Sequence, residues 1–275
     1  MKWACVLAVL LMSIDHDSEA AFSSAFTAFI TEEYGNDAAQ LLIRSDFGNQ
    51  GSFGGDMQKN SSEPSIPVKR RPVIIVHGVT NMAMKFGFIY ATTYGHGPHR
   101  FIVFVKMECQ YIKQIRAFIT SVSSFTESKV DVLAYSMGSP IARKALLGGD
   151  CESEYLGPPI TDLVETFIGV AGANYGSYLC FIPIGICNSD NGLSCDSRLL
   201  HDLNTQSRKY EGSYTFAIFS RSDNKVGMSC CGRNCSSIPH SDGEYIFDGM
   251  DHDQIMHETL GLQLELLNRG YSIGR

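Results

Sequence analysis

Residues 129–140, KVDVLAYSMGSP, predict a sharp turn between a buried strand and a helix. The first half of this stretch is apolar and β-type, and the second half suits a helix whose first turn contains a proline. Between the halves, Ser136 has the small residues Ala134 and Gly138 two positions away on either side. A serine on such a turn needs small neighbours because the backbone folds tightly around it. The stretch therefore predicts an exposed nucleophilic serine on an α/β fold; a chance small-x-Ser-x-Gly turn is the competing interpretation.

Apolar runs and helical patterns alternate along the rest of the chain. Residues 71–78, RPVIIVHG, form a continuous apolar run that ends in a His-Gly turn, as expected for a central parallel strand. Further strands are predicted at 89–94, 163–171 and 214–220, and helices at 21–42, 108–124 and 257–268. This alternation predicts an α/β class protein with a mostly parallel central sheet and helices on both faces.

The N-terminus has the order of features that is typical of a signal peptide. Lys2 is followed by an apolar run and then by the small-x-small end Ser18-Glu19-Ala20. The run is shorter than the roughly 20 residues that span a bilayer, so secretion is preferred over a transmembrane anchor. We expect a signal peptide at 1–20 and one catalytic domain at 21–275, in which 21–67 form an N-terminal helix and a Gly- and Ser-rich extension.

Cysteine usage also favours an extracellular protein. Cys5 lies in the expected signal peptide and leaves eight cysteines, which predict up to four disulfides whose pairing the sequence leaves open. The cysteines at 230–235 are alternative zinc ligands, but their spacing is not that of a structural zinc site. Asn60 and Asn234 begin glycosylation sequons.

The charge balance excludes one class of partner. The chain has 22 basic and 29 acidic residues, a net charge of -7, and loss of the signal peptide leaves -5. Its one basic cluster, residues 69–71, directly precedes a predicted strand and is expected to be solvated. Nucleic acid is therefore not an expected partner.

A nucleophilic serine needs a base, and the base needs an acid that fixes its tautomer. Asp223 follows the predicted strand at 214–220, and His252 lies 29 residues further on, before a helix expected to begin near Gln254. The order Ser, Asp, His, with each residue after a strand, is that of α/β-hydrolases. We predict Ser136, Asp223 and His252 as the catalytic residues.

Other residues compete for these roles. His240 and His257 are rival bases, but the first lies in a cysteine-flanked loop and the second within a predicted helix. The carboxylates that flank His252 are rival acids, yet a sequence neighbour is poorly placed to reach the imidazole ring, and we interpret them as helix caps. These carboxylates are Asp248, Asp251 and Asp253.

Attack by a serine on a carbonyl group also requires backbone N–H groups that face the developing oxyanion. By position, Met137 provides one of these donors. We expect Val79, after the His-Gly turn, to provide the second, with Gly78 permitting the close backbone approach. His77 is expected to be structural.

Several stretches carry a resemblance to a known family: PVIIVHG, KVDVLAYSMGSP, VAGANYG, SRSDNKVG and MDHDQ, with the AFSSAFTAFI start and the GSFGG segment. The chain resembles the secreted class 2 lipases over nearly its whole mature length, most closely their nematode branch. The resemblance implies the α/β-hydrolase fold and carboxylic ester hydrolysis without cofactor or metal. It marks Ser136 as nucleophile, Asp223 as acid and His252 as base, with acylglycerols or shorter acyl esters as substrates.

Residues 79–88 depart from the family pattern. Family members usually have a full helix and a longer loop between the His-Gly turn and the next strand, whereas only ten residues intervene here. That length is about the minimum for a parallel crossover. Two functions therefore compete: a secreted lipase or esterase that forms an acyl-enzyme, and a secreted non-catalytic paralogue with a truncated oxyanion region that binds lipid or protein.

Residues 175–196 are rich in Gly, Cys and Asn and predict a surface insertion near the site. Their apolar residues could line an acyl pocket, face a membrane or belong to the core: Phe181, Ile182, Pro183, Ile184 and Ile186. The expected partner is a lipid or small ester substrate, with room for transient contact with a membrane or lipid-droplet surface. The sequence leaves the oligomeric state open.

Overall fold

The computed structural model describes residues 21–55, 71–78, 89–95, 106–182 and 184–272. Some of the sequence predictions lie outside these residues and stay predictions. They are the signal peptide at 1–20, the sequon at Asn60, the segment at 79–88 with Val79, and Pro183.

A seven-stranded sheet forms the centre of the fold, in the spatial order β1-β3-β2-β4-β7-β8-β11. All neighbouring strands are parallel except β1 and β3 at one edge, which pair in antiparallel fashion. The strands are β1 (Ser52–Phe53), β2 (Val73–Val76), β3 (Ile89–Thr92), β4 (Val130–Tyr135), β7 (Val164–Val170), β8 (Tyr214–Ser220) and β11 (Gly243–Phe247). The predicted mostly parallel sheet is confirmed.

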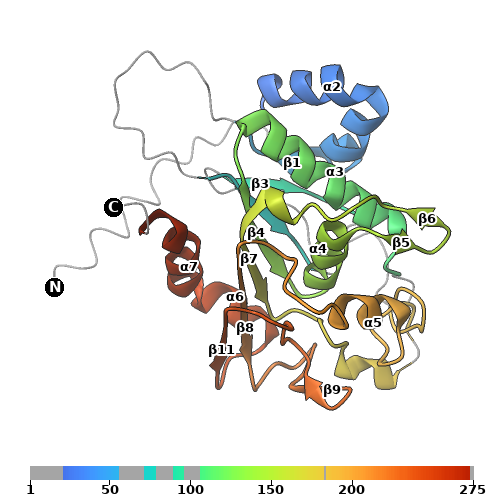
Figure 1. Ribbon diagram of the computed structural model, residues 1–275, viewed down its shortest axis with the longest axis vertical. Coiled ribbons are helices and arrows are strands. Elements are labelled where there is room, and N and C mark those ends of the chain that lie inside the picture. Colours follow the sequence, from blue (N-terminus) through green and yellow to red (C-terminus); the bar gives the residue numbers. More distant parts are fainter. Residues whose placement is uncertain (1–20, 56–70, 79–88, 96–105, 183, 273–275) are drawn as a thin grey trace.

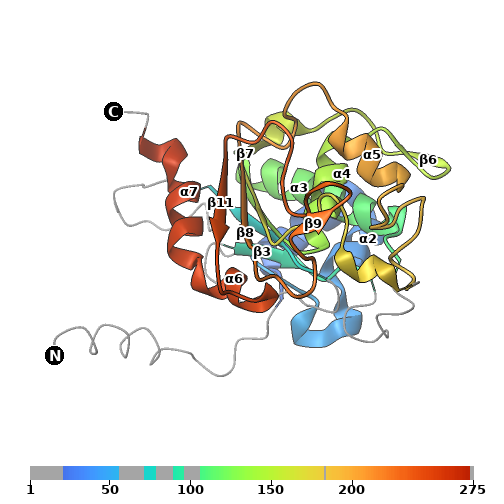
Figure 2. The same ribbon diagram turned by 90° about the horizontal axis from the view of Figure 1, so that it is seen from below.

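Two helical layers cover the sheet. Figures 1 and 2 show α6 (His252–Glu258) and α7 (Leu260–Ser272) on one side of it and the other labelled helices on the opposite side. The helices of that opposite layer are α2 (Ser24–Ile43), α3 (Cys109–Thr126), α4 (Gly138–Leu147) and α5 (Arg198–Asn204). Shorter elements are η1 (Ser45–Gln50), η4 (Thr161–Leu163), η5 (Tyr178–Phe181), β5 (Asp150–Cys151), β6 (Glu154–Tyr155), β9 (Ser229–Cys230) and β10 (Arg233–Asn234).

Strand β4 shows why the sheet needs both layers. Val130, Val132 and Ala134 belong to the large core under α2, α3 and α4, whereas Leu133 and Tyr135 belong to the smaller core under α6 and α7. Successive side chains of a strand point to opposite faces, so a strand that is buried at every position must be covered twice. The apolar run that precedes Ser136 therefore fixes β4 at the centre of the sheet.

Two elements differ from the sequence predictions. Strand β11 was not predicted, because GEYIF has alternating half-buried and exposed residues rather than a continuous apolar run. It lies at the sheet edge, where one face and one ladder are open. The helix predicted at 257–268 is two helices, α6 and α7, that are separated at Thr259.

All eight cysteines outside the expected signal peptide are paired. The disulfides are Cys109–Cys151, Cys180–Cys187, Cys195–Cys231 and Cys230–Cys235. The cysteines at 230–235 are therefore not zinc ligands, and within the described residues no cluster of three or more His, Cys, Asp or Glu side chains has the arrangement of a metal site. No helix in the described part of the chain is long and apolar enough to cross a bilayer.

A buried ion pair holds α4 against the segment around α5. Arg143 is completely buried, and its Nε lies 2.9 Å from Oε1 of Glu211. The guanidinium also donates to the side-chain oxygen of Asn204 and to the carbonyl of Leu203, both at 3.0 Å. A charge this deeply buried is tolerated only while its partner and hydrogen bonds are in place.

We expect Glu211→Gln to lower the free energy of unfolding by about 3–5 kcal/mol, because it leaves the Arg143 charge uncompensated in the core. Lys129→Met is the matched control, since it breaks the more exposed 3.0 Å pair with Glu165 and should cost less than about 1 kcal/mol. Urea unfolding of both variants measures the difference. Equal losses would contradict the structural importance of the buried pair.

Candidate active site

The turn after β4 presents Ser136 with a positive φ of 57°. The turn can be this tight because Gly138 has no side chain: a Cβ there would lie 2.4 Å from the carbonyl oxygens of both Val76 and His77. The backbone N–H of Ser136 donates to the carbonyl of Val170 on β7 at 3.0 Å. The serine is thereby raised at the carboxyl end of the sheet between a strand and the first turn of α4.

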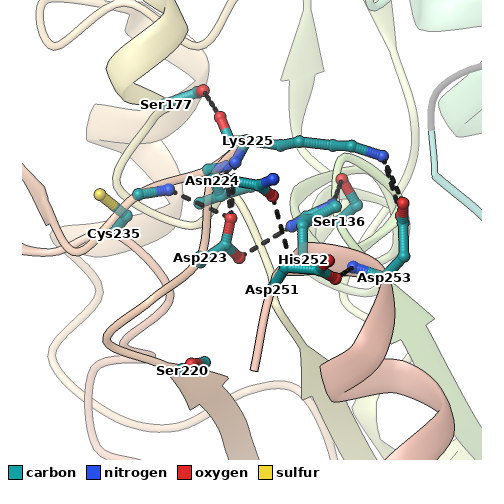
Figure 3. A network of polar contacts seen from close by, with 12 residues as sticks. Ser136, Ser177, Ser220, Asp223, Asn224, Lys225, Cys235, Asp251, His252 and Asp253 are labelled. Carbon is teal, nitrogen blue, oxygen red and sulfur yellow. Dashed lines mark hydrogen bonds and ion pairs between the residues drawn. The ribbon is translucent and has the colours of Figure 1, made fainter. Parts of the chain in front are cut away.

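Three residues that lie far apart in the sequence form one hydrogen-bonded chain at this end of the sheet (Figure 3). Nε2 of His252 lies 2.9 Å from Oγ of Ser136, and Nδ1 of the same ring lies 2.8 Å from Oδ2 of Asp223. Ser136 follows β4, Asp223 follows β8 and His252 follows β11. Because a carboxylate only accepts hydrogen bonds, Nδ1 carries the proton and Nε2 is left to accept from the serine hydroxyl.

The loop after β8 keeps Asp223 ionised. Burial raises the pKa of Asp223, but the hydrogen bond and the charge of His252, together with backbone N–H donors, outweigh burial and hold it below its usual range. Oδ1 accepts from the backbone N–H groups of Lys225 at 2.9 Å and Val226 at 2.8 Å. The second oxygen therefore remains a carboxylate acceptor for the imidazole at neutral pH.

Further contacts tie the loop of Asp223 to the segment of His252. Lys225 Nζ lies 2.8 Å from an oxygen of Asp253, and Oδ1 of Asn224 accepts from the backbone N–H of His252 at 3.3 Å (Figure 3). The Tyr135 hydroxyl lies 2.9 Å from Oδ1 of Asp253 and 3.0 Å from the carbonyl oxygen of His252. These contacts fix the base from both sides, and sequence reasoning did not find them.

Comparison with known proteins identifies the family. The family model described as Lipase (class 2) matches residues 70–265, well over half of the chain. This chain belongs to the class 2 lipase family. A search of curated proteins found no significant match to it.

Solved structures agree with this class 2 lipase in fold. A Bacillus licheniformis lipase in mature form aligns with a TM-score of 0.50 and 14% identity, over 78% of this chain and 97% of that one. Aspergillus fumigatus lipase B aligns with a TM-score of 0.54 and 16% identity, over 88% of this chain and 70% of that one. At these identities the likeness shows the α/β-hydrolase fold.

The rival carboxylates of this class 2 lipase have other partners. Asp251 caps α6, where its carboxylate accepts from the backbone N–H of Gln254 and the Gln254 side chain accepts from the Asp251 N–H, both at 2.8 Å. The predicted capping role is thus confirmed for Asp251. It is wrong for Asp248 and Asp253, which pair with Arg221 and Lys225, respectively.

The rival histidines of this class 2 lipase take different places. His240 lies 3.1 Å from the carbonyl oxygen of Gln206, and His257 is exposed on α6.

One side of the oxyanion region lies within the described residues. Met137 follows Ser136 directly and is buried at the start of α4. Gly78 approaches the nucleophile so closely that a Cβ on it would lie 2.9 Å from Cβ of Ser136. Val79, the second predicted donor, lies outside the described residues and stays a prediction.

His77 supports the backbone beside the nucleophile. Its buried ring stacks on Tyr94 at 4.3 Å, Nδ1 donates to the carbonyl of Gly78 at 2.8 Å, and Nε2 accepts from the Tyr94 N–H at 3.3 Å. Burial lowers the pKa of His77 to about 4, the hydrogen bond to Gly78 opposes this, and the Arg44 charge lowers the pKa further. Both ring nitrogens are occupied and the ring is neutral at pH 7, as a structural histidine would be.

We expect the stability of this lipase to fall as pH decreases from 6.5 to about 4. In that window the unfolded chain protonates His77 and the folded chain does not, so the loss reaches up to about 3 kcal/mol. Urea unfolding across this range should show a much smaller slope for His77→Gln. His257→Gln is the control on an exposed histidine and should retain the wild-type slope; a slope unchanged by His77→Gln would contradict the assignment.

Proposed function

We propose that this class 2 lipase is a secreted carboxylic ester hydrolase whose catalytic residues are Ser136, His252 and Asp223. The observation that carries the proposal is the unbroken chain of hydrogen bonds at 2.9 and 2.8 Å that links the three side chains on a strained turn. Membership of a lipase family supports ester hydrolysis as the reaction.

In the proposed reaction, His252 takes the proton of the Ser136 hydroxyl as the serine oxygen attacks the ester carbonyl carbon. The tetrahedral intermediate collapses, and the imidazolium gives its proton to the leaving alcohol. The acyl group stays on the serine. Water, deprotonated by the same imidazole, then attacks the acyl-enzyme and releases the carboxylic acid, with the proton returned to the serine oxygen.

Two further parts of the site have roles in this scheme. Asp223 fixes the Nδ1–H tautomer and stabilises the imidazolium while it exists. The backbone N–H groups of Met137 and Val79 are the proposed donors to the oxyanion, where loss of one donor costs about 10²- to 10³-fold in kcat in comparable enzymes.

Substrate class and location are the finer parts of the proposal. We place acylglycerols and shorter acyl esters among the substrates, because the family and both aligned solved structures are described as lipases. Export is supported by the four disulfides, which persist in oxidising compartments. The signal peptide at 1–20 and glycosylation at Asn234 belong to the same proposal.

A non-catalytic paralogue is the second candidate. The observation that favours it is the segment at 79–88, which is only ten residues long. This segment is shorter than is usual in the family and contains the predicted oxyanion donor Val79, so its shortening would remove part of the oxyanion region. The complete hydrogen-bonded chain at Ser136 favours the hydrolase, since a binding protein has no need of a buried carboxylate and a histidine aligned on a serine hydroxyl.

We expect the purified chain to hydrolyse p-nitrophenyl butyrate and p-nitrophenyl palmitate, and Ser136→Ala to lower both rates by at least about 10⁴-fold. The ratio of the two rates reports preference for short or long acyl chains. Thermal unfolding of the variant checks that it is folded. Negligible rates from a folded wild-type chain would reject the hydrolase and favour the non-catalytic paralogue.

Tyr135→Phe should lower kcat for p-nitrophenyl butyrate by about tenfold with little change in KM, because the hydroxyl that holds His252 and Asp253 is lost. It should also cost about 1–3 kcal/mol of stability, because a buried carbonyl loses its donor. Tyr210→Phe is the matched control, since its hydroxyl donates to the buried carbonyl of Leu203 at 3.1 Å. Equal kcat losses in the two variants would show that the role of Tyr135 is only structural.

A further inference from the structure

Two large apolar side chains project into solvent beside a disulfide on the surface loop that follows β7. Phe181 is 88% exposed and Ile182 is 59% exposed, and we call this pair the apolar tip. Phe181 is the most exposed large apolar residue within the described part of the chain. Of the residues predicted to line a pocket, face a membrane or join the core, Ile186 is buried and belongs to the core, whereas the tip does not.

The apolar tip is carried by a closed loop. Cys180, next to Phe181, forms a disulfide with Cys187, and η5 begins with a side-chain cap in which Ser177 accepts from the backbone N–H of Leu179 at 3.2 Å. A segment that is closed covalently loses little conformational freedom on contact with a surface, so its exposed side chains are already placed for insertion.

This loop is fastened to the loop that holds the triad acid. The hydroxyl groups of Ser177 and Tyr178 donate to the carbonyls of Lys225 and Asn224, each at 2.7 Å, and the Tyr178 N–H donates to the Val226 carbonyl at 2.9 Å (Figure 3 shows the contact of Ser177). Tyr178 also lies against Gly227, where a Cβ would approach its ring carbon to within 2.9 Å. The apolar tip and Asp223 are therefore on two loops that are bonded to each other.

Charge indicates which kind of surface the apolar tip fits. Residues 171–188, AGANYGSYLCFIPIGICN, contain no acidic or basic residue, although the chain as a whole has a net charge of -7. An uncharged apolar projection on an acidic protein is attracted neither to an acidic partner nor to an anionic lipid surface. It matches a neutral, apolar phase, into which exposed aromatic and aliphatic side chains transfer favourably from water.

We propose that Phe181 and Ile182 insert into the surface of neutral lipid, such as a triacylglycerol droplet, and hold the carboxyl end of the sheet against it. The proposal rests on the ester hydrolase function and names the surface on which that function acts. With the apolar tip inserted, the loop of Asp223 lies at the lipid surface. An ester molecule that leaves the lipid there is therefore close to the site of Ser136. A second copy of the chain is the competing occupant of the apolar tip.

The test measures binding separately from turnover. The Ser136→Ala chain is mixed with triolein droplets coated with phosphatidylcholine, and the protein that floats with the droplets is quantified. We expect Phe181→Ser in this background to weaken binding by about tenfold or more, as expected for loss of one buried phenylalanine. Tyr155→Ser is the matched control, because Tyr155 is a 68% exposed aromatic residue on the β5–β6 hairpin, and it should leave flotation unchanged.

Equal flotation of the Phe181→Ser and Tyr155→Ser chains would overturn the proposal. A second result would also overturn it: sedimentation that shows a wild-type dimer and a Phe181→Ser monomer, together with equal droplet binding by both. That result would assign the apolar tip to contact with a second copy of the chain. In the active chain we expect Phe181→Ser to lower the ratio of the triolein rate to the p-nitrophenyl acetate rate by about tenfold. Failure of the hydrolase function is seen separately, as droplet binding by a wild-type chain that hydrolyses neither ester.

Discussion

The contact between Gly138 and the carbonyl oxygens at the end of β2 is the constraint on which the site depends. Because α4 begins with a residue that has no side chain, its first turn lies directly against Val76 and His77, and the chain can turn within a single residue. That residue, Ser136, is left with a positive φ that costs free energy in any residue other than glycine. The cost is offset by bonds on both sides: its N–H donates to the carbonyl of Val170, and its carbonyl accepts from the N–H of Ala173 at 3.2 Å.

A parallel sheet makes such a turn useful because it gathers the ends of its strands at one edge. Ser136, Asp223 and His252 each follow a different strand of the sheet. Short loops are therefore enough to bring their side chains together. The buried polar contacts then remove the remaining freedom. Asn174, completely buried, accepts from the Ser139 hydroxyl on α4 at 2.8 Å and donates to the carbonyl of Ser236 at 3.0 Å. It thus links the helix behind the nucleophile to the disulfide-bonded loop that follows β10.

The sequence predicted those features that depend on residues close to each other in the chain, such as the strand and turn around Ser136. Strand β4 is buried on both faces and is apolar apart from Asp131, whereas β11 lies at an edge and alternates between half-buried and exposed residues, so it was not recognised. The chain order and strand context were enough to choose Asp223 and His252, and the structure brings both to Ser136. Tyr135, 118 residues from Asp253, could not be found in this way, because its contacts depend on which strands are neighbours. The pairing of the cysteines was open for the same reason.

The loop after β8 has two sides with different chemistry, and it connects the surface of the proposed lipid contact to the proposed catalytic acid. Its backbone N–H groups point inward and hold the carboxylate of Asp223, while its carbonyl oxygens at Asn224 and Val226 accept from Tyr178 on the loop that bears the apolar tip. Since peptide N–H and C=O groups of one short turn cannot shift independently, a displacement of the outer loop would also displace the acid. Cys180–Cys187 closes the loop that bears the apolar tip, and Cys230–Cys235 closes the β9–β10 hairpin that follows the loop of Asp223. In the proposed docking, the apolar tip and Asp223 therefore move together, because their two loops are hydrogen-bonded to each other.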